Sequence, residues 1–197
     1  MFKATEGAPA SIAPAGAKLP VIGTNPFALA VPDEHGGARF VLDQSASVVA
    51  KSEVILRSRR GESIPEGWAL DARGNPTTDP DAALKGSMLP SGGAKGFGVG
   101  LLVEVLASVL SGAVASRDAS PFSGPAGGPP ATGQCFIAID PAAYAPGFTT
   151  RLAALAEAIE GQDGARLPGA RRRAARERTS VEGVELDADL ARRLGLR

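Results

Sequence analysis

Cysteine and histidine are almost absent from this chain of 197 residues. Cys135 is its single cysteine, so no disulfide can form within the chain. His35 is its single histidine, so a zinc site built from the usual cysteine and histidine ligands is not expected. We therefore predict no internal disulfide and no metal site.

The chain also lacks the features that attract nucleic acids and membranes. Its 21 basic residues balance 21 acidic ones, so there is no electrostatic case for nucleic acid or an anionic membrane as a partner. The most apolar segment, residues 97–115, contains Glu104 and several small residues, which favours a buried helix over a membrane span. Because the first residues show no apolar signal region, we expect a cytoplasmic protein.

What remains is the composition of an ordinary soluble globular protein. Hydrophobic residues make up 44% of the chain and charged residues 21%. The length suits one domain with a sizeable core, or one domain plus a fragment of another. Positive charge gathers in residues 169–176, but an acidic stretch follows, so we interpret this basic run as a solvated helix face.

The first third of the chain predicts an irregular start, a hairpin and a helix. Residues 1–20 are rich in alanine, proline and glycine and lack periodicity, which is typical of an irregular segment. Residues 27–31 and 39–42 are β-type runs joined by a turn, which indicates a hairpin. A helix is expected over residues 47–60, with Ser45 or Ser47 as its cap.

The remainder contains the strongest helix and one strand. Residues 95–112 are apolar on nearly every side, which predicts a deeply buried helix. Residues 116–133 have the composition of a long loop, and residues 134–140, with Cys135, that of a buried strand. Further helices are expected over residues 81–85, 148–159, 170–178 and 187–194.

Glycines and a lysine open the apolar helix, in the run Gly92-Gly93-Ala94-Lys95-Gly96. Glycines let a backbone approach a ligand closely, and a helix N-terminus presents free N–H groups and a positive dipole end to phosphate. The spacing matches neither a P-loop nor the Rossmann fingerprint. Tight helix packing, with Lys95 reaching solvent, explains the same residues equally well, so the local pattern favours neither interpretation.

Two further segments carry side chains suited to a nucleotide. In residues 41–47, Asp43 can accept hydrogen bonds from ribose hydroxyls and Ser45 can donate to phosphate, although helix capping is the simpler interpretation. In residues 166–171, a Pro-Gly turn is flanked by arginines that can approach a phosphate or an adenine ring. There too, a turn with solvated charges is the simpler interpretation.

Seven short motifs occur in one order along the chain, and the ordered combination is more specific than any single motif. In this combination the chain resembles the malate/L-lactate dehydrogenase-2 family, which includes sulfolactate and ureidoglycolate dehydrogenases and Δ1-pyrroline- and Δ1-piperideine-2-carboxylate reductases. The resemblance covers nearly the whole chain from about Pro20 onward. The motifs are Gly23-Thr24-Asn25-Pro26, Asp43-Gln44-Ser45-Ala46-Ser47, residues 64–71, residues 74–80, residues 89–96, residues 136–140 and Arg166-Leu167-Pro168-Gly169.

The resemblance implies an α/β fold with a non-Rossmann NAD(P)-binding domain, a mixed sheet and flanking helices, incomplete in this chain. Residues 21–165 would be the portion of the cofactor-binding domain, and residues 166–197 a helical segment that packs on the family's N-terminal part. NAD or NADP would be the cofactor, a small molecule the substrate, and the complete enzyme a homodimer. The resemblance places these residues at the cofactor: Asp43, Gln44, Ser45, Ala94, Lys95, Gly169, Ala170 and Arg171.

Departures from the family pattern bear on this inference. Ala94 stands where family members often have His, Tyr or Trp, and Arg171 stands where many have Glu. The family carries its catalytic histidines ahead of the Gly-Thr-Asn-Pro motif, and nothing in this chain resembles that segment. Hydride transfer to a carbonyl or imine needs a proton donor. His35 is expected to be an exposed turn residue, so no catalytic residue is assigned.

Two functions therefore stand open. In the first, the chain is a fragment or truncated form of an oxidoreductase that moves hydride between NAD(P)H and a small 2-hydroxy or 2-oxo acid or a cyclic 2-imino acid. In the second, it is a catalytically inactive remnant that binds the cofactor or assists assembly. An unrelated phosphate-binding module would explain only the glycine-lysine run.

Overall fold

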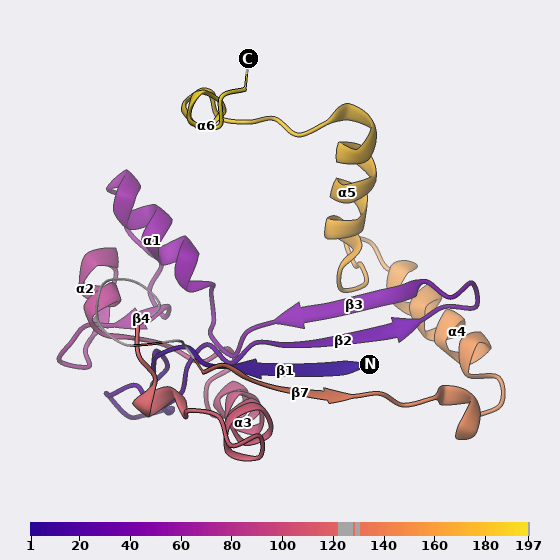
Figure 1. Cartoon of the computed structure of the whole chain (residues 1–197), viewed down its shortest axis with the longest axis horizontal. Coiled ribbons are helices and arrows are strands. Elements are labelled where there is room, and N and C mark those ends of the chain that lie inside the picture. Colours follow the sequence, from indigo (N-terminus) through magenta and orange to yellow (C-terminus); the bar gives the residue numbers. More distant parts are fainter. Residues whose placement is uncertain (122–127, 129–130, 197) are drawn as a thin grey trace.

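The computed structural model describes residues 1–121, 128 and 131–196, and its largest element is a four-stranded antiparallel sheet. The strands are β1 (Phe2–Glu6), β2 (Phe27–Pro32), β3 (Ala38–Gln44) and β7 (Gly133–Ile137), in the order β3-β2-β1-β7 (Figure 1). β2 and β3 form the expected hairpin, with Phe27 opposite Gln44. The end of β3, on which the site below depends, therefore lies beside the start of β2.

The expectation that residues 1–20 are irregular is wrong for Phe2–Glu6, which form a central strand. In β1, Phe2 pairs with Leu29 on one side and with Ile137 on the other. Its two buried positions hold Ala4 and Glu6, so the apolar alternation that identifies a strand is missing. Tertiary pairing, rather than local pattern, makes this segment a strand.

A smaller sheet and two helices enclose a separate core. The sheet has the order β5-β4-β6, from Pro76–Thr77, Ala69–Leu70 and Ser87–Met88, and a parallel bridge joins Ile12 to Met88 beside it. The helices are α1 (Lys51–Arg60) and α2 (Pro80–Lys85). The core consists of Ile12, Ile22, Ala46, Val54, Ile64, Ala69, Ala83 and Met88.

Helix α1 starts later than expected. Its N-cap is Ala50, without a side-chain cap, so the prediction of a cap by Ser45 or Ser47 is wrong. Ser47 instead donates to the carbonyl of Val49 at 2.7 Å. The other end is as expected, because Gly61 has a left-handed conformation with φ of 66°.

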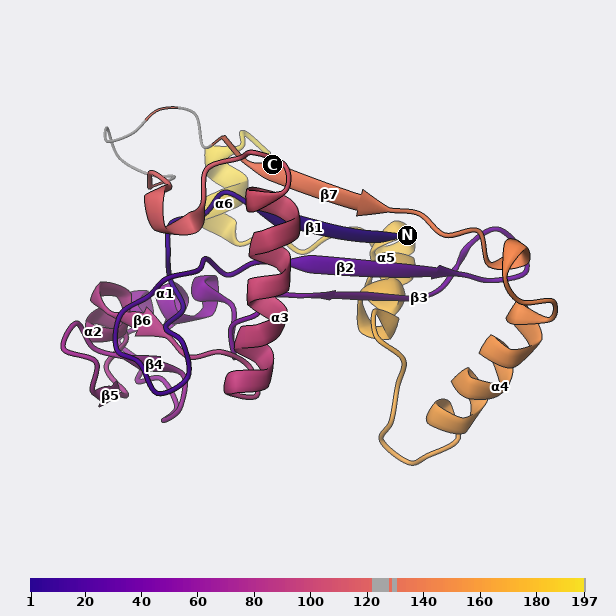
Figure 2. The ribbon, with the colours of Figure 1, turned by 90° about the horizontal axis from the view of Figure 1, so that it is seen from below.

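The strongest predicted helix comprises α3 (Ala94–Glu104) and the π-helical η1 (Val105–Val109), which cross one face of the main sheet (Figure 2). Val103 and Ala107 are buried there against Ala4. The expectation of burial on all sides is wrong, since Leu102 and Leu110 are 53% and 71% exposed. Only the stripe of residues that faces the strands is covered.

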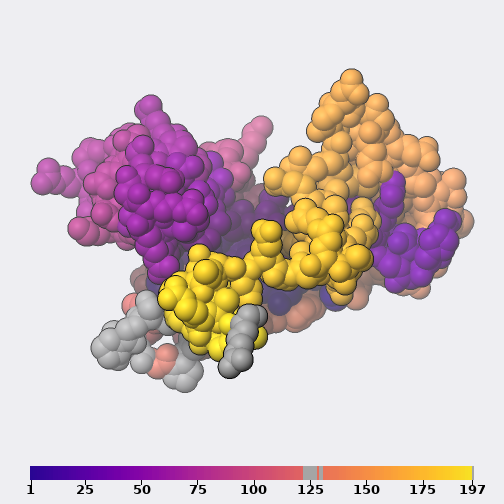
Figure 3. Space-filling model, turned by 90° about the horizontal axis from the view of Figure 1, so that it is seen from above, coloured from indigo at the N-terminus to yellow at the C-terminus, as the bar shows by residue number. Residues whose placement is uncertain are grey.

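The last third of the chain projects from this body. It contains α4 (Phe148–Glu160), α5 (Ala170–Glu182) and α6 (Ala188–Arg193), and short 3-10 turns η2 (Ser116–Asp118) and η3 (Pro141–Ala143) flank β7. α5 lies on the side of the main sheet opposite α3 (Figure 1). In Figure 3, α4 (orange) stands apart from the purple body that holds α1 and α2.

β7 is an edge strand, so the prediction of a buried strand over residues 134–140 is wrong. Phe136 is 56% exposed, Ile139 is 65% exposed, and Cys135 is only partly buried. The predicted loop over residues 116–133 begins with η2, but residues 122–127 and 129–130 lie outside the described part. The α/β class, with mixed strand pairing and flanking helices, is confirmed. None of the helices described here has the length and apolarity needed to cross a bilayer.

Candidate functional site

A cleft of about 650 Å³ lies between the end of β3 and the turn that leads into α5. β3 supplies Asp43 and Gln44, the turn supplies Gly169, and the first turn of α5 supplies Arg171. These residues come from two of the three segments that the sequence singled out. The complete lining is Val41, Leu42, Asp43, Gln44, Gly164, Arg166, Leu167, Pro168, Gly169, Arg171 and Arg172.

The turn is held against β3 by its backbone. The N–H of Val41 donates to the carbonyl of Pro168 at 3.3 Å, and the side chain of Leu167 is 2% exposed. Gly169 has φ of 82°, and a Cβ at this position would lie 2.8 Å from the carbonyl oxygen of Val41. Glycine is therefore required here both by its backbone conformation and by the close approach of β3.

Positive charge dominates the cleft. Arg166, Arg171 and Arg172 all line it, and Asp43 is the one carboxylate among the described lining residues. Arg172 Nη2 donates to Asp43 Oδ2 at 2.8 Å, which leaves two guanidinium groups in excess. Planar guanidinium groups suit the bidentate binding of phosphate oxygens. The cleft thus suits an anionic ligand that also carries hydroxyl groups for Asp43.

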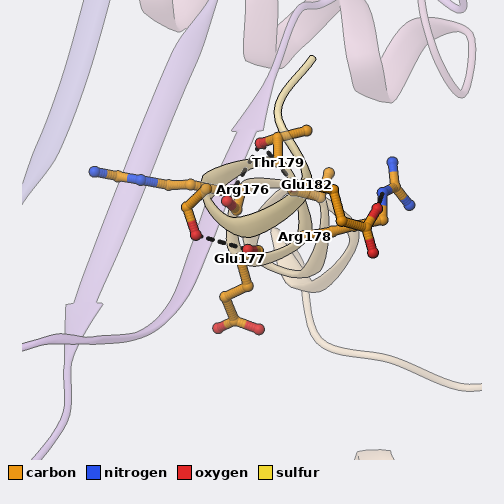
Figure 4. A network of polar contacts seen from close by, with 7 residues as sticks. Arg176, Glu177, Arg178, Thr179 and Glu182 are labelled. Carbon is orange, nitrogen blue, oxygen red and sulfur yellow. Dashed lines mark hydrogen bonds and ion pairs between the residues drawn. The ribbon is translucent and has the colours of Figure 1, made fainter. Parts of the chain in front are cut away.

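Sequence reasoning missed Arg172, although it pairs with Asp43. Arg172 belongs to the basic run of residues 169–176, but the residues of that run after Arg171 were interpreted only as a solvated helix face. That interpretation is confirmed for the later turns of α5, which contains no buried residue. Figure 4 shows Arg178 paired with Glu182 on this helix, 3.9 Å apart, and Thr179 bonded to backbone carbonyls.

The segment after β3 and the loop before α3 lie side by side. Ala46 N–H donates to the carbonyl of Thr24, and Ser91 N–H donates to the carbonyl of Ala46, both at 2.8 Å. Gly100 permits this approach, because a Cβ there would lie 2.8 Å from the Cβ of Ala46. The hydrogen bonds bring Ser45 close to the loop that ends at the first turn of α3.

Ala94 and Lys95 occupy that first turn, and both side chains are exposed. Their N-cap is Gly93, which has φ of 63°. In the described part of the chain, Lys95 makes no salt bridge. Neither residue lines the 650 Å³ cleft, and neither do Ser45 and Ala170. The structure thus unites Asp43, Gln44, Gly169 and Arg171 around the cleft and leaves the remaining four candidates outside it.

His35 lies where the sequence predicted it, in the turn between β2 and β3. Its backbone N–H donates to Asp33 Oδ1 at 2.8 Å, and its side chain is 83% exposed. The imidazole is 3.4 Å from the carboxylate of Glu34, which is also exposed. This environment is that of a solvated turn residue.

Comparison with known proteins identifies several proteins to which the chain is similar. Residues 1–195 match the family model for malate/L-lactate dehydrogenase. The chain is 47% identical over 183 residues to a (2R)-3-sulfolactate dehydrogenase (NADP(+)) of Chromohalobacter salexigens, covering 93% of this chain and 54% of that protein. It is 44% identical over 182 residues to a Δ1-pyrroline-2-carboxylate reductase of Agrobacterium fabrum, covering 90% and 52% respectively.

A solved structure agrees with these relatives. The crystal structure of a Δ1-piperideine-2-carboxylate reductase from Pseudomonas syringae superposes with a TM-score of 0.83 at 34% identity, covering 97% of this chain and 58% of that one. The chain thus spans about half the length of the curated relatives it matches. These relatives are named as dehydrogenases and reductases, which confirms the expected enzyme class at the level of the family. The chain belongs to the malate/L-lactate dehydrogenase family.

Proposed function

We propose that this chain forms the cofactor-binding part of an oxidoreductase that moves hydride between NADP(H) and a small 2-oxo acid or cyclic 2-imino acid. The observation that carries the proposal is the cleft in which Asp43 at the end of β3 meets the arginine-flanked turn at Gly169. The substrate class follows the names of the relatives, which act on sulfolactate and on pyrroline-2-carboxylate.

Each residue of the cleft has a distinct proposed role. Asp43 accepts hydrogen bonds from ribose hydroxyls, and Gln44 extends that polar edge. Gly169 lets the backbone of the turn approach the nucleotide closely. Arg171 binds the phosphate that distinguishes NADP from NAD, with Arg172 shared between this phosphate and Asp43. An arginine at position 171 favours a phosphorylated ribose, because a guanidinium group and a phosphate carry opposite charges.

Lys95 is proposed to act outside this cleft. It stands exposed at the first turn of α3, where backbone N–H groups point out of the helix, and Ala94 and Ser45 lie on the neighbouring backbone. A pyrophosphate or nicotinamide ribose in that position would gain a point charge from Lys95. The cofactor would then extend from the arginines of α5 to the head of α3. No described residue is assigned as the proton donor.

The C-terminal helices are proposed to dock on the remainder of the complete enzyme. α5 and α6 contain no buried residue, and Val181, Val184 and Leu194 are 86%, 69% and 59% exposed. Exposed apolar residues gathered in one segment are typical of an unfilled interface. A homodimer is proposed for the complete enzyme on the family resemblance.

Titration of the purified chain with NADPH and with NADH tests the proposal. We expect quenching of Trp68 or enhancement of cofactor fluorescence on binding, with tighter binding of NADPH. Arg171→Ala should weaken NADPH binding by about tenfold or more, because a charge-assisted hydrogen bond contributes about 1.5–3 kcal/mol, and should leave NADH nearly unchanged. Lys95→Ala should weaken both cofactors.

Arg178→Ala is the matched control, because Arg178 lies on the same helix but pairs with Glu182 away from the cleft. It should bind both cofactors like the parent chain. A folded chain that binds neither cofactor would contradict the cofactor site and support an inactive remnant. Equal loss for NADH and NADPH in Arg171→Ala would contradict the role of Arg171 in selecting NADP.

A further inference from the structure

Four polar residues are buried together under α3, and the cofactor site uses none of them. Glu6 is 1% exposed, Asn25 0%, Glu104 6% and Ser116 1%. They come from the end of β1, the turn before β2, the end of α3 and the start of η2. Segments distant in the sequence are therefore joined by these side chains.

Glu104 is fully supplied with donors. The backbone N–H of Ser116 donates to Oε1 at 2.8 Å, and the Ser116 hydroxyl donates to Oε2 at 2.6 Å. Asn25 Nδ2 donates to Glu104 Oε2 and to the carbonyl of Gly100, both at 2.8 Å. These three hydrogen bonds provide donors to both oxygens of the Glu104 carboxyl group.

Glu6 is in the opposite situation. Its Oε1 accepts from the N–H of Ala8 at 2.8 Å, but its Oε2 is buried without a partner, as is Asn25 Oδ1. The two side chains converge beside Gly23, where a Cβ would lie 2.7 Å from Glu6 Oε1 and 3.0 Å from Asn25 Oδ1. An ionised Glu6 would leave buried acceptor atoms with no donor, whereas a neutral Glu6 carries the O–H that the cluster lacks.

No counter-charge balances the two carboxyl groups in the described part of the chain. Lys3 on β1 lies over the ring of Phe136, 5.4 Å from its centroid. Arg117 on η2 is exposed and pairs with Asp118. Lys95 is exposed in the first turn of α3, whereas Glu104 ends that helix. β2, β7 and η1 have no acidic or basic side chains.

We propose that Glu6 and Glu104 together bind one proton at neutral pH, carried by the Glu6 carboxyl group, and that this proton fixes α3 against β1 and the turn at residues 23–26. Two carboxylates in one buried site repel each other, so ionising both carries a large free-energy cost. The proton supplies a donor to the unpartnered oxygens and removes the repulsion between the carboxylates. Asn25 then transmits the restraint to Gly100, on the helix whose first turn holds Lys95.

The titration of Glu6 agrees with this geometry. Burial raises the pKa of its carboxyl group above 4.5, and the charge of Glu104 raises it further, against the hydrogen bond from the N–H of Ala8 that lowers it. With a raised pKa, the folded chain binds more protons than the unfolded chain. The stabilisation is therefore complete below about pH 4.5 and is lost as pH rises toward the folded-state pKa.

Chemical denaturation of the full chain from pH 5 to pH 9 tests the proposal. The free energy of unfolding of the parent chain should fall as pH rises, because Glu6 loses its proton. Glu6→Gln, whose amide is a permanent donor of nearly the same shape, should remain folded and show a smaller slope. Glu66→Gln, a change at an exposed position, should keep the slope of the parent chain.

Infrared spectroscopy gives a second measurement on the folded state. The parent chain at pH 7 should show the carbonyl band of a buried protonated carboxyl group, and Glu6→Gln should lack it. An unchanged pH slope in Glu6→Gln, or the absence of that band from the parent chain, would overturn the proposal. So would stabilisation of the parent chain by K⁺ or Ca²⁺ at constant ionic strength that Glu6→Gln removes, because a hard cation bound by oxygens would then occupy the site.

Discussion

The body of the molecule and its C-terminal third are built on different principles. Up to residue 121, side chains from two sheets and from helices α1, α2 and α3 pack into two hydrophobic cores. After residue 131, Ala156 and Leu167 are the only buried hydrophobic side chains among the described residues. The contrast shows that helix formation and burial are separate matters: α4, α5 and α6 are regular helices without a core of their own.

Core truncation should give the largest difference between the two parts. Ile12 is fully buried between β6 and the segment at Ile22, so Ile12→Ala should destabilise the chain by about 2–5 kcal/mol. Val181→Ala, a change at an 86% exposed position of α5, should stay within about 0.5 kcal/mol. Chemical denaturation measures both, and comparable losses would show that α5 shares the core.

The turn at Gly169 is where the two parts meet, and its substitution should have an intermediate effect. Gly169→Ala forces a left-handed residue against the carbonyl of Val41, which costs about 1–3 kcal/mol in local strain. We expect weaker NADPH binding and faster proteolysis of α5, with the core almost unaffected.

Gly147→Ala is the control for Gly169→Ala, since Gly147 is also left-handed, with φ of 75°, but has nothing within 4 Å of the added Cβ. This control variant adds only the free-energy cost of placing alanine in a left-handed backbone conformation. If both variants bind NADPH equally well, the approach of the turn to β3 does not shape the cleft.

The ion pair between Arg172 and Asp43 should have the smallest effect on stability. Its side chains are 67% and 43% exposed, and water screens such pairs to about 1 kcal/mol or less. A double-mutant cycle with Arg172→Ala and Asp43→Asn measures the coupling. A coupling well above that value would mean that this pair, and not the turn backbone, attaches α5 to the sheet.

Local patterns predicted the elements that local interactions stabilise. The hairpin of β2 and β3, α2 and the C-terminal helices follow from turn residues and apolar spacing. β1 was not predictable, because Ala4 and Glu6 at its buried positions give no apolar alternation. The exposed side of α3 was not predictable either, since an apolar residue at a surface looks like any other in a sequence.

The candidate site was predictable only in pieces. Asp43, Lys95 and the turn at Gly169 each carried a local signal, but each also had a structural explanation. Asp43 and Arg172 lie 129 positions apart and meet only through the pairing of Val41 with Pro168. Glu104 was visible as an acid in an apolar helix, but its partners Glu6 and Ser116 depend on the fold of β1 and η2.

The position of the cleft has a thermodynamic consequence. Because its walls come from β3 on one side and from the start of α5 on the other, a dinucleotide bound there would connect a well-ordered body to a weakly held segment. Such a ligand stabilises the state that binds it in proportion to the logarithm of its concentration. Hydrogen exchange in α5 should then slow when the cofactor saturates the cleft, while exchange in the core stays unchanged. The protection of α5 would therefore report the fraction of chains that hold cofactor.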